Sequence, residues 1–359
     1  MDKTLQPLVS VVTPAYNEEK HLAECIESVL AQTYQNWDYT IVNNRSTDGT
    51  LEIARRYAAK DPRIRIHNNG QFLPMLANHN VAVRQLSPVS KYCKMVLADD
   101  WIFPECLEQM VAVAETYPSV GVVSAYQRYG EQVRITGLPL EQTFVTGEEA
   151  CREFLMGKLL LFGSQTSVLY RADLVRSRDP FFVETDAFAD FESCFWLLKA
   201  SDLGFVHAIL TFSRPRAEST GAISADLGAH FESMLGLLFT YGQDCLSSSE
   251  FNGCLERQMS QYYSFLGRRL LVEHDRDFWS YHKKTLASFG LGLDRARLAR
   301  TAAAEMFASV LNPKSTIERV KRLFTLKKIR NRQARRVVPS LEEDGSIRAI
   351  NGSGGDDAR

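Results

Sequence analysis

The chain has 359 residues, of which 45% are hydrophobic and 24% charged, a balance typical of folded proteins that excludes wholesale disorder. Its 42 Lys and Arg against 43 Asp and Glu give a formal net charge of −1, which argues against a protein that coats nucleic acid through bulk charge. At roughly 150 residues per domain, the length predicts two domains or one large one.

Seven cysteines are scattered along the chain without a CxxC pair. Their odd number and wide spacing argue against a disulfide framework or a zinc site, and they predict a reduced, cytoplasmic protein. The first residues lack the charged and apolar regions of a signal peptide. No run of about eighteen apolar residues predicts a membrane-spanning helix.

The first 125 residues alternate short apolar runs with amphipathic stretches. This alternation predicts an α/β fold, a mostly parallel sheet with helices on both faces. The expected strands are 8–13, 39–42, 64–67, 92–97 and 120–124, and the expected helices are 18–31, 48–59, 75–86 and 104–115.

The pattern is mixed from 127 to 214 and helical after 217. The mixed part predicts strands at 132–136, 166–170 and 204–212 and helices at 147–156 and 190–200. The helical part predicts helices at 227–238, 251–271, 278–289, 294–310 and 315–336. Residues 339–359 are rich in Gly, Ser, Asp and Glu, a composition that predicts a disordered tail.

Ligands of open parallel sheets bind at the carboxyl ends of the strands. Asp99 and Asp100 follow the apolar run 95–97 at such an end. Adjacent carboxylates there are costly unless a positive charge compensates them, and a divalent cation with oxygen ligands does so. The alternative interpretation is a solvated turn that caps the helix after Pro104.

The segment Ser46-Thr47-Asp48-Gly49-Thr50 follows the second expected strand. By itself it reads as a turn with Ser46 or Thr47 as the cap of the next helix. The chain contains neither GxGxxG nor GxxxxGK[ST], so the dinucleotide-binding and P-loop fingerprints are missing.

Three segments in this order resemble the family 2 glycosyltransferases: Val11 to Glu19, Ser46 to Thr50, and Leu97 to Trp101. The resemblance covers roughly residues 7–215. It implies a GT-A fold and an enzyme that uses a nucleotide-diphospho-sugar. It also implies a GT-A domain at 1–216, with a nucleotide-sugar half to about 125 and an acceptor half at about 126–216, followed by a helical region at 217–338 and the tail.

The resemblance assigns donor-binding residues position by position. The loop after the first strand lies against the nucleotide in this family, and it contributes here Thr13, Pro14, Tyr16 and Asn17. Asn43 and Asn44 stand where relatives often carry an acidic residue that contacts the base. Asp100 is the expected direct ligand of Mn²⁺ or Mg²⁺, with Asp99 toward the ribose or the metal.

Asp190 matches the family's general base, which takes the proton of the acceptor hydroxyl. The preceding residue is Ala189, where the family has Glu. A helix cap with solvated charge is the alternative interpretation, and Asp186 and Glu184 are nearby rivals.

The remaining expected site residues lie around the last strand of the domain. Arg214 and Arg216 either bind the diphosphate, whose geometry guanidinium matches, or are surface charges. Gly163 and Ser164 resemble the small, polar start of the acceptor-side strand in relatives.

The resemblance thus implies an inverting glycosyltransferase that moves a sugar to a hydroxyl acceptor in exopolysaccharide, lipopolysaccharide or other surface-glycan synthesis. The alternative is a non-catalytic relative that binds a nucleotide sugar as a scaffold. A nucleotidyltransferase would need a Gly-rich, Arg-containing loop that 13–18 does not offer.

Residues 314–336 contain ten Lys or Arg and one acid. This basic amphipathic stretch predicts either peripheral contact with an anionic membrane, suited to a lipid-linked acceptor at the inner face, or simple packing on the domain. The expected partners are therefore a nucleotide-sugar donor and a glycan or lipid-linked acceptor, with no nucleic acid.

Overall fold

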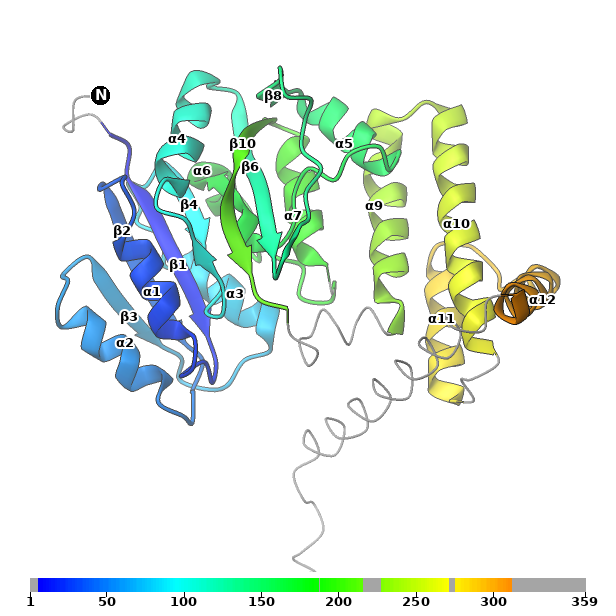
Figure 1. Cartoon of the computed structure of the whole chain (residues 1–359), viewed down its shortest axis with the longest axis horizontal. Coiled ribbons are helices and arrows are strands. Elements are labelled where there is room, and N and C mark those ends of the chain that lie inside the picture. Colours follow the sequence, from blue (N-terminus) through cyan, green and yellow to red (C-terminus); the bar gives the residue numbers. More distant parts are fainter. Residues whose placement is uncertain (1–5, 187, 216–226, 271–274, 312–359) are drawn as a thin grey trace, which may run out of the picture. The chain divides into compact units, whose positions relative to one another are not determined.

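The computed structural model describes residues 6–186, 188–215, 227–270 and 275–311. Within these residues, ten strands form one sheet in the order β3-β2-β1-β4-β9-β6-β10-β5, with β7 beside β6 and β8 beside β10 (Figure 1). The strands are β1 (Val9–Ala15), β2 (Trp37–Asn43), β3 (Ile64–Asn68), β4 (Tyr92–Met95), β5 (Trp101–Ile102), β6 (Val120–Tyr129), β7 (Gln132–Val133), β8 (Phe144–Val145), β9 (Val168–Arg171) and β10 (Asp202–Ser213).

The helices alternate with strands from β1 to β4, as the sequence predicts for the first part of the chain, but within the described residues none separates β4 from β5 or interrupts the run from β6 to β8. They are α1 (Leu22–Leu30), α2 (Thr50–Ala58), α3 (Met75–Arg84), α4 (Cys106–Thr116), α5 (Gly147–Leu155), η2 (Gln165–Ser167), α6 (Ala172–Arg176), α7 (Ala189–Leu198), α9 (Ala229–Cys245), α10 (Ser248–Leu270), α11 (Arg276–Ser288) and α12 (Arg295–Leu311). The short elements β5, β8 and α6 were not predicted. The expected cap of α2 was wrong, because Gly49 precedes its first residue and no side chain caps it.

Strand directions place the ligand edge. Strands β1 to β4 pair in parallel, as do β6 and β10, whereas β9 runs antiparallel between β4 and β6. The order reverses at β1, since β2 and β3 lie on one side of it and β4 on the other. In such sheets the crevice at the carboxyl end of this switch point binds ligands.

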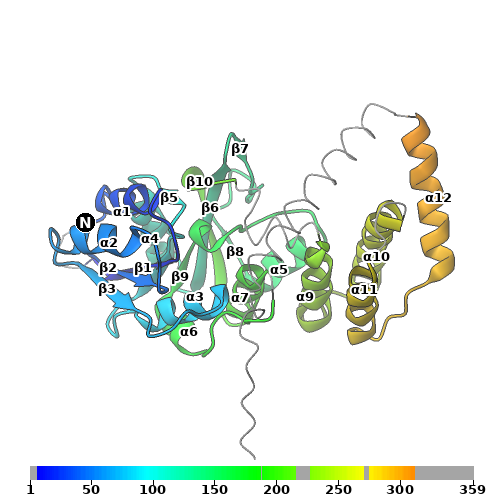
Figure 2. The ribbon, with the colours of Figure 1, turned by 90° about the horizontal axis from the view of Figure 1, so that it is seen from below.

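Alternate side chains of each strand bury on opposite faces. Val12, Met95 and Phe205 pack with helices α3, α5, α6 and α7. Val11, Val96 and Val206 pack with α1, α2 and α4. Seen from below, α1 and α2 lie on one side of the sheet and α3 and α6 on the other (Figure 2). The predicted mostly parallel sheet with helices on both faces is confirmed.

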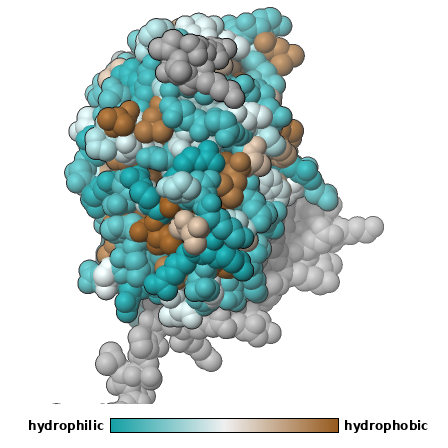
Figure 3. All heavy atoms as spheres, turned by 90° about the vertical axis from the view of Figure 1, so that its left-hand side faces the viewer, coloured by the Kyte–Doolittle hydropathy of each residue, from teal (hydrophilic) through white to brown (hydrophobic). Residues whose placement is uncertain are grey.

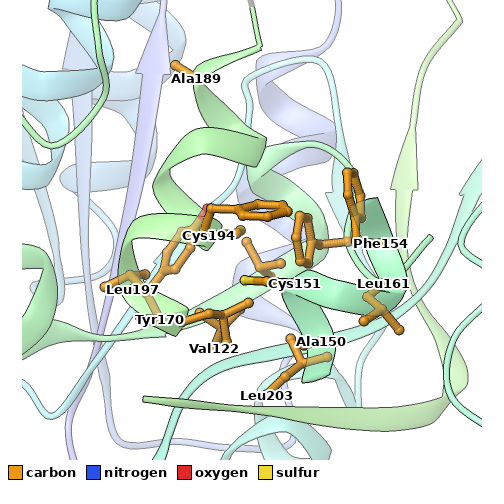
Figure 4. Close-up of a cluster of buried hydrophobic side chains, with 14 of the residues drawn as sticks. Val122, Ala150, Cys151, Phe154, Leu161, Tyr170, Ala189, Cys194, Leu197 and Leu203 are labelled. Atoms are coloured by element: carbon orange, nitrogen blue, oxygen red, sulfur yellow. The ribbon is translucent and has the colours of Figure 1, made fainter. Parts of the chain in front are cut away.

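The core on the α5 and α7 side is rich in sulfur and aromatic groups (Figure 4). It continues into α9 through Leu237, Leu238 and Tyr241. Helices α9 to α12 also share an apolar cluster of their own, around Tyr262, Leu266 and Phe278. The described residues up to Glu305 form one compact unit, and those from Met306 on are not part of it. The expected boundary at 216/217 lies outside the described residues.

All seven cysteines are buried and free. Burial raises the pKa of both Cys25 and Cys93 to about 12. These thiols are therefore core groups and not nucleophiles.

Within the described ranges, no helix is both long and apolar enough to span a bilayer. The face on the left of Figure 1 is mainly hydrophilic, with small separate apolar spots (Figure 3). The basic stretch 314–336 and the expected tail 339–359 lie outside the described residues, so both remain predictions.

The start of α5 packs against the end of α7 with no room for a side chain. A Cβ on Gly147 would come within 2.0 Å of the Leu198 carbonyl oxygen and 2.1 Å of that of Ser201. We expect Gly147→Ala to lower the free energy of unfolding by about 2 kcal/mol or more, in the range of overpacked cores. Urea denaturation measures it.

Gly253→Ala is the matched control, because Gly253 lies inside α10 and a Cβ there has nothing within 4 Å. Alanine favours helix over glycine by up to about 1 kcal/mol, so this variant should be neutral or more stable. Equal losses in both variants would contradict the packing argument.

Candidate active site

Asp100 is the centre of the polar cluster at the carboxyl edge of the sheet. Asp100 is only 4% exposed. Oδ2 accepts hydrogen bonds from the hydroxyls of Thr166 at 2.7 Å and Ser213 at 2.8 Å, and Oδ1 accepts one from the Arg214 backbone N–H at 3.2 Å. Burial, and secondarily the charge of Asp99, raises the pKa of Asp100 to about 7 in spite of these donors.

Thr166 holds Asp100 in a fixed direction. Its hydroxyl oxygen accepts the Leu97 N–H at 3.1 Å, while its proton is donated to Asp100. Because Leu97 supplies a donor, the Thr166 proton is left for the carboxylate. Thr166 therefore connects η2 to the segment after β4 that carries both aspartates.

Lys94 is fully buried beneath this cluster, inside the apolar strand β4. Nζ donates to the carbonyl oxygens of Thr166 at 2.7 Å and Val168 at 3.1 Å, and lies 3.6 Å from Met110 Sδ. Burial lowers the pKa of Lys94, opposed by nearby groups that include Asp100. Lys94 was not predicted from the sequence as part of the site, although a lysine within an apolar strand was a usable signal.

Gly163 and Ser164 lie beside the same cluster. Gln127 Nε2 donates to Ser164 Oγ at 2.8 Å and to Ser213 Oγ at 3.0 Å. A Cβ on Gly163 would approach Gln127 Oε1 to 2.6 Å, so glycine permits this close contact. Ser164 Oγ lies 3.2 Å from Ser213 Oγ, which donates to Asp100, so Ser164 is one hydroxyl away from Asp100. The acceptor role of Gly163 and Ser164 stays a prediction.

Arg214 reaches over the aspartates. Its Nε donates to the Asp99 carbonyl oxygen at 3.3 Å, and Nη2 pairs with Glu24 of α1 at 2.6 Å. Its guanidinium lies 5.4 Å from the Trp101 ring, and that ring stacks on Phe212. Arg214 is therefore a cation at the edge that carries the Asp pair. Arg216 lies outside the described residues.

The loop after β1 and the 46–50 segment are joined by hydrogen bonds. Asn17, in the left-handed region with φ of 52°, accepts the Thr47 N–H at 2.8 Å and donates its own N–H to Ser46 Oγ at 3.1 Å. Asp48 accepts the N–H groups of Glu19 and Thr50. Partial burial raises the pKa of Asp48, but hydrogen bonds from Thr50 and Glu19 outweigh it and lower that pKa.

Several predicted nucleotide contacts are buried. Thr13 is fully buried and donates to the Val96 carbonyl oxygen at 2.7 Å. Asn43 donates to Asn68 Oδ1, and Asn44 bonds both backbone groups of Leu73. Asn43 and Asn44 are at most 2% exposed, so these three side chains hold the loops together. Pro14 and Tyr16 lie at the strand end, where Tyr16 is 44% exposed.

Asp190 lies in the first turn of α7. Only three residues join α7 to β10, so its beginning points toward the edge where β6 and β10 end (Figure 1). Burial raises the pKa of Asp190 to about 7, with the Phe191 N–H opposing and Asp186 adding to the rise. That pKa suits a general base near neutral pH. The rivals Asp186 and Glu184 instead accept hydrogen bonds from Ser233 and Asn80.

The carboxylates of Asp99 and Asp100 are the candidate cation ligands at this edge. Asp100 has one acceptor position left, on Oδ1, after its three hydrogen bonds. The described residues contain no group of three or more His, Cys, Asp or Glu able to hold a metal. Mg²⁺ is commonly held by one or two carboxylates and substrate phosphates, so the residues fit a cation that arrives with its nucleotide.

Comparison with solved structures identifies the architecture as GT-A. Staphylococcus aureus TarS 1-349 in complex with UDP-GlcNAc matches at a TM-score of 0.59 with 17% identity, over 78% of this chain and 80% of that one. The mannosyltransferase PcManGT from Pyrobaculum calidifontis, in complex with GDP-Man and Mn²⁺, matches at 0.53 with 14% identity, over 92% and 88%. At these identities the likeness shows the fold.

Residues 10–178 match the model of glycosyl transferase family 2, so this part of the chain is similar to that family. The putative glycosyltransferase EpsE of Bacillus subtilis is 39% identical over 118 residues, 33% of this chain and 42% of the relative. GlyG of Streptococcus pneumoniae is 29% identical over 153 residues, 42% of this chain and 48% of the relative. The chain thus spans less than half the length of these relatives.

The Thr166 bridge predicts a stability difference between two buried threonines. Thr166→Val leaves the Leu97 N–H without its acceptor and Asp100 without a donor. We expect the free energy of unfolding to fall by about 2 kcal/mol or more. Thr211 of β10 is also fully buried, but its hydroxyl has no partner among the described residues, so Thr211→Val should not lower stability. Thermal unfolding of both variants decides; equal losses would contradict the bridge.

Asp190 predicts a pH dependence of stability. Its pKa is about 7 in the folded chain against 3.8 for an ordinary Asp. The folded state therefore binds the proton more tightly, and this contribution to stability, present below pH 4, is lost as the pH rises to 7. Asp190→Asn has no carboxyl group to ionise, so it does not lose stability in this way as the pH rises. We expect it to gain stability relative to wild type between pH 5 and pH 8 in urea titrations. A constant difference would contradict the raised pKa of Asp190.

Proposed function

We propose that this protein is an inverting glycosyltransferase that moves a sugar from a nucleotide-diphospho-sugar to a hydroxyl of a glycan or lipid-linked acceptor. One observation carries the proposal. The Asp99–Asp100 pair and the Arg214 cation share the carboxyl edge of a family 2 sheet, and Asp190 begins a helix directed at that edge. The names of the relatives EpsE and GlyG, both glycosyltransferases, support it.

Asp99 and Asp100 would hold Mn²⁺ or Mg²⁺ together with the donor diphosphate. When bound, such a cation supplies positive charge that favours departure of the diphosphate. The other groups of the chain prepare this edge. Thr166 and Ser213 fix the Asp100 carboxylate, and Arg214 lies where it can exchange Glu24 for a phosphate oxygen. Guanidinium matches phosphate oxygens in geometry.

Asp190 is the proposed general base. The acceptor oxygen forms a bond to the anomeric carbon while the bond from that carbon to the diphosphate oxygen breaks, and Asp190 takes the hydroxyl proton. A single displacement of this kind inverts the anomeric configuration. A carboxylate of raised pKa retains the proton better than an ordinary one, and burial raises the pKa of Asp190 to about 7.

Synthesis of a surface polysaccharide remains the proposed setting. The buried positions of Asn43 and Asn44 favour no particular base, so the donor has to be found by experiment. Peripheral membrane contact through 314–336 and a cytoplasmic place of action are proposals that rest on sequence composition.

The test is release of nucleoside diphosphate from UDP-, GDP-, dTDP- and CDP-sugars with Mn²⁺, with water as the surrogate acceptor. We expect Asp190→Asn to slow release by about 10²-fold or more, in the range of general-base contributions. Thermal shift with the matching nucleotide should show donor binding unchanged. Asp186→Asn is the control and should retain most of the activity.

Three results would change the proposal. A folded wild type that binds no nucleotide would contradict it. Binding without release, with acceptor glycans also supplied, would favour the scaffold alternative. Loss of activity in Asp186→Asn alone would move the base from Asp190 to Asp186.

A further inference from the structure

Two exposed aromatic rings meet at the carboxyl edge of the sheet. Tyr16, in the loop after β1, is 44% exposed and Phe72, in the loop after β3, is 57% exposed. Their ring centroids are 4.8 Å apart with an interplanar angle of 58°. Large apolar rings left in solvent at a binding edge offer stacking area that a ligand can cover. Tyr16 was predicted from the sequence as a nucleotide contact, whereas Phe72 was not.

Asn44 fixes the loop that carries Phe72. Asn44 Oδ1 accepts the Leu73 N–H at 2.9 Å and its Nδ2 donates to the Leu73 carbonyl oxygen at 2.8 Å. Oδ1 also accepts from Asn69 Nδ2 at 2.9 Å. Both backbone groups of the residue after Phe72 are thereby bound by one buried side chain, so the ring has a fixed base.

The loop that carries Tyr16 is fixed as well. The next residue, Asn17, is joined to Ser46 and Thr47 through its backbone N–H and its side-chain oxygen. Two separate hydrogen-bonded supports therefore hold the two rings. Such a pair is preorganised, and ordering it on binding has little entropic cost.

The ligand that fits is flat, aromatic and attached to negative charge. β1 ends next to β4, whose continuation carries Asp99 and Asp100, and neighbouring strands lie about 4.8 Å apart. The rings stand on the side of β1 toward β2 and β3, whereas the Asp pair and Arg214 stand on the side toward β4. A nucleotide has this layout, because its base lies at one end and its diphosphate at the other.

We propose that Phe72 extends Tyr16 into a two-ring platform for the donor's nucleobase, and that Asn44 positions this platform instead of reading the base. The inference rests on the proposed function, because it assumes a nucleotide-sugar donor. Stacking accepts every base through its π-face. The platform therefore supplies affinity for the base, with little discrimination among bases.

The test is the Kd of UDP and GDP, with Mn²⁺, measured by calorimetry on the full chain. Base–aromatic stacking is worth about 1–3 kcal/mol per base, so Phe72→Ala should raise the Kd of nucleotides by about tenfold or more. Phe72→Tyr should restore it. Inorganic pyrophosphate, which has no base, should bind wild type and Phe72→Ala equally.

Val89→Ala is the matched control, because Val89 is 80% exposed and precedes β4 at the opposite edge of the sheet. It should leave the Kd unchanged. Asn44→Ala should weaken UDP and GDP by the same factor, whereas a base-reading Asn44 would alter their ratio. Such a changed ratio would overturn the role given to Asn44.

The outcomes separate the two proposals. Unchanged nucleotide Kd in Phe72→Ala, with wild type binding normally, would overturn the platform and leave the proposed function intact. A wild type that binds no nucleoside diphosphate would overturn both. Equal weakening of pyrophosphate and nucleotides in Phe72→Ala would show a general disturbance of the site and would also overturn the platform.

Discussion

A buried carboxylate at the end of an apolar strand run needs donors, and Asp100 obtains them from segments far along the chain. Thr166 is 66 residues away and Ser213 is 113 residues away. The end of β10 and the turn before β9 must therefore come together before this aspartate is stabilised. Gln127, Ser164 and Lys94 belong to the same polar cluster around Asp100. The cluster forms only when these strands are assembled, and it in turn stabilises their arrangement.

The loops at this edge are braced mainly by small polar side chains. Asn17, Ser46, Asp48 and Asn44 bind backbone groups of neighbouring loops. Such bonds hold loop geometry without occupying the surface, and this leaves Tyr16 and Phe72 facing solvent. The edge thus combines a rigid backbone with open side chains, which is the arrangement that preorganised binding requires.

The sequence was sufficient for the layers of the fold because apolar periodicity reports directly on burial. It was insufficient for β5 and β8, which have two residues each, and for the reversed direction of β9, since alternation carries no direction. Asp100 was predictable as a carboxylate at a strand end. Thr166 and Ser213 were not identified as its partners, because hydroxyls are common and their contacts are long-range. Phe72 was missed because a lone aromatic in a loop has no pattern.

The burial of every cysteine makes this chain convenient for spectroscopy. The seven native thiols are inaccessible, and burial raises the pKa of several of them, Cys25 and Cys93 among them, far from neutrality. Reagents that need an exposed thiolate should not modify these buried cysteines. A single cysteine introduced on the surface would then be the only one to carry a fluorophore or spin label, and no native cysteine would have to be removed.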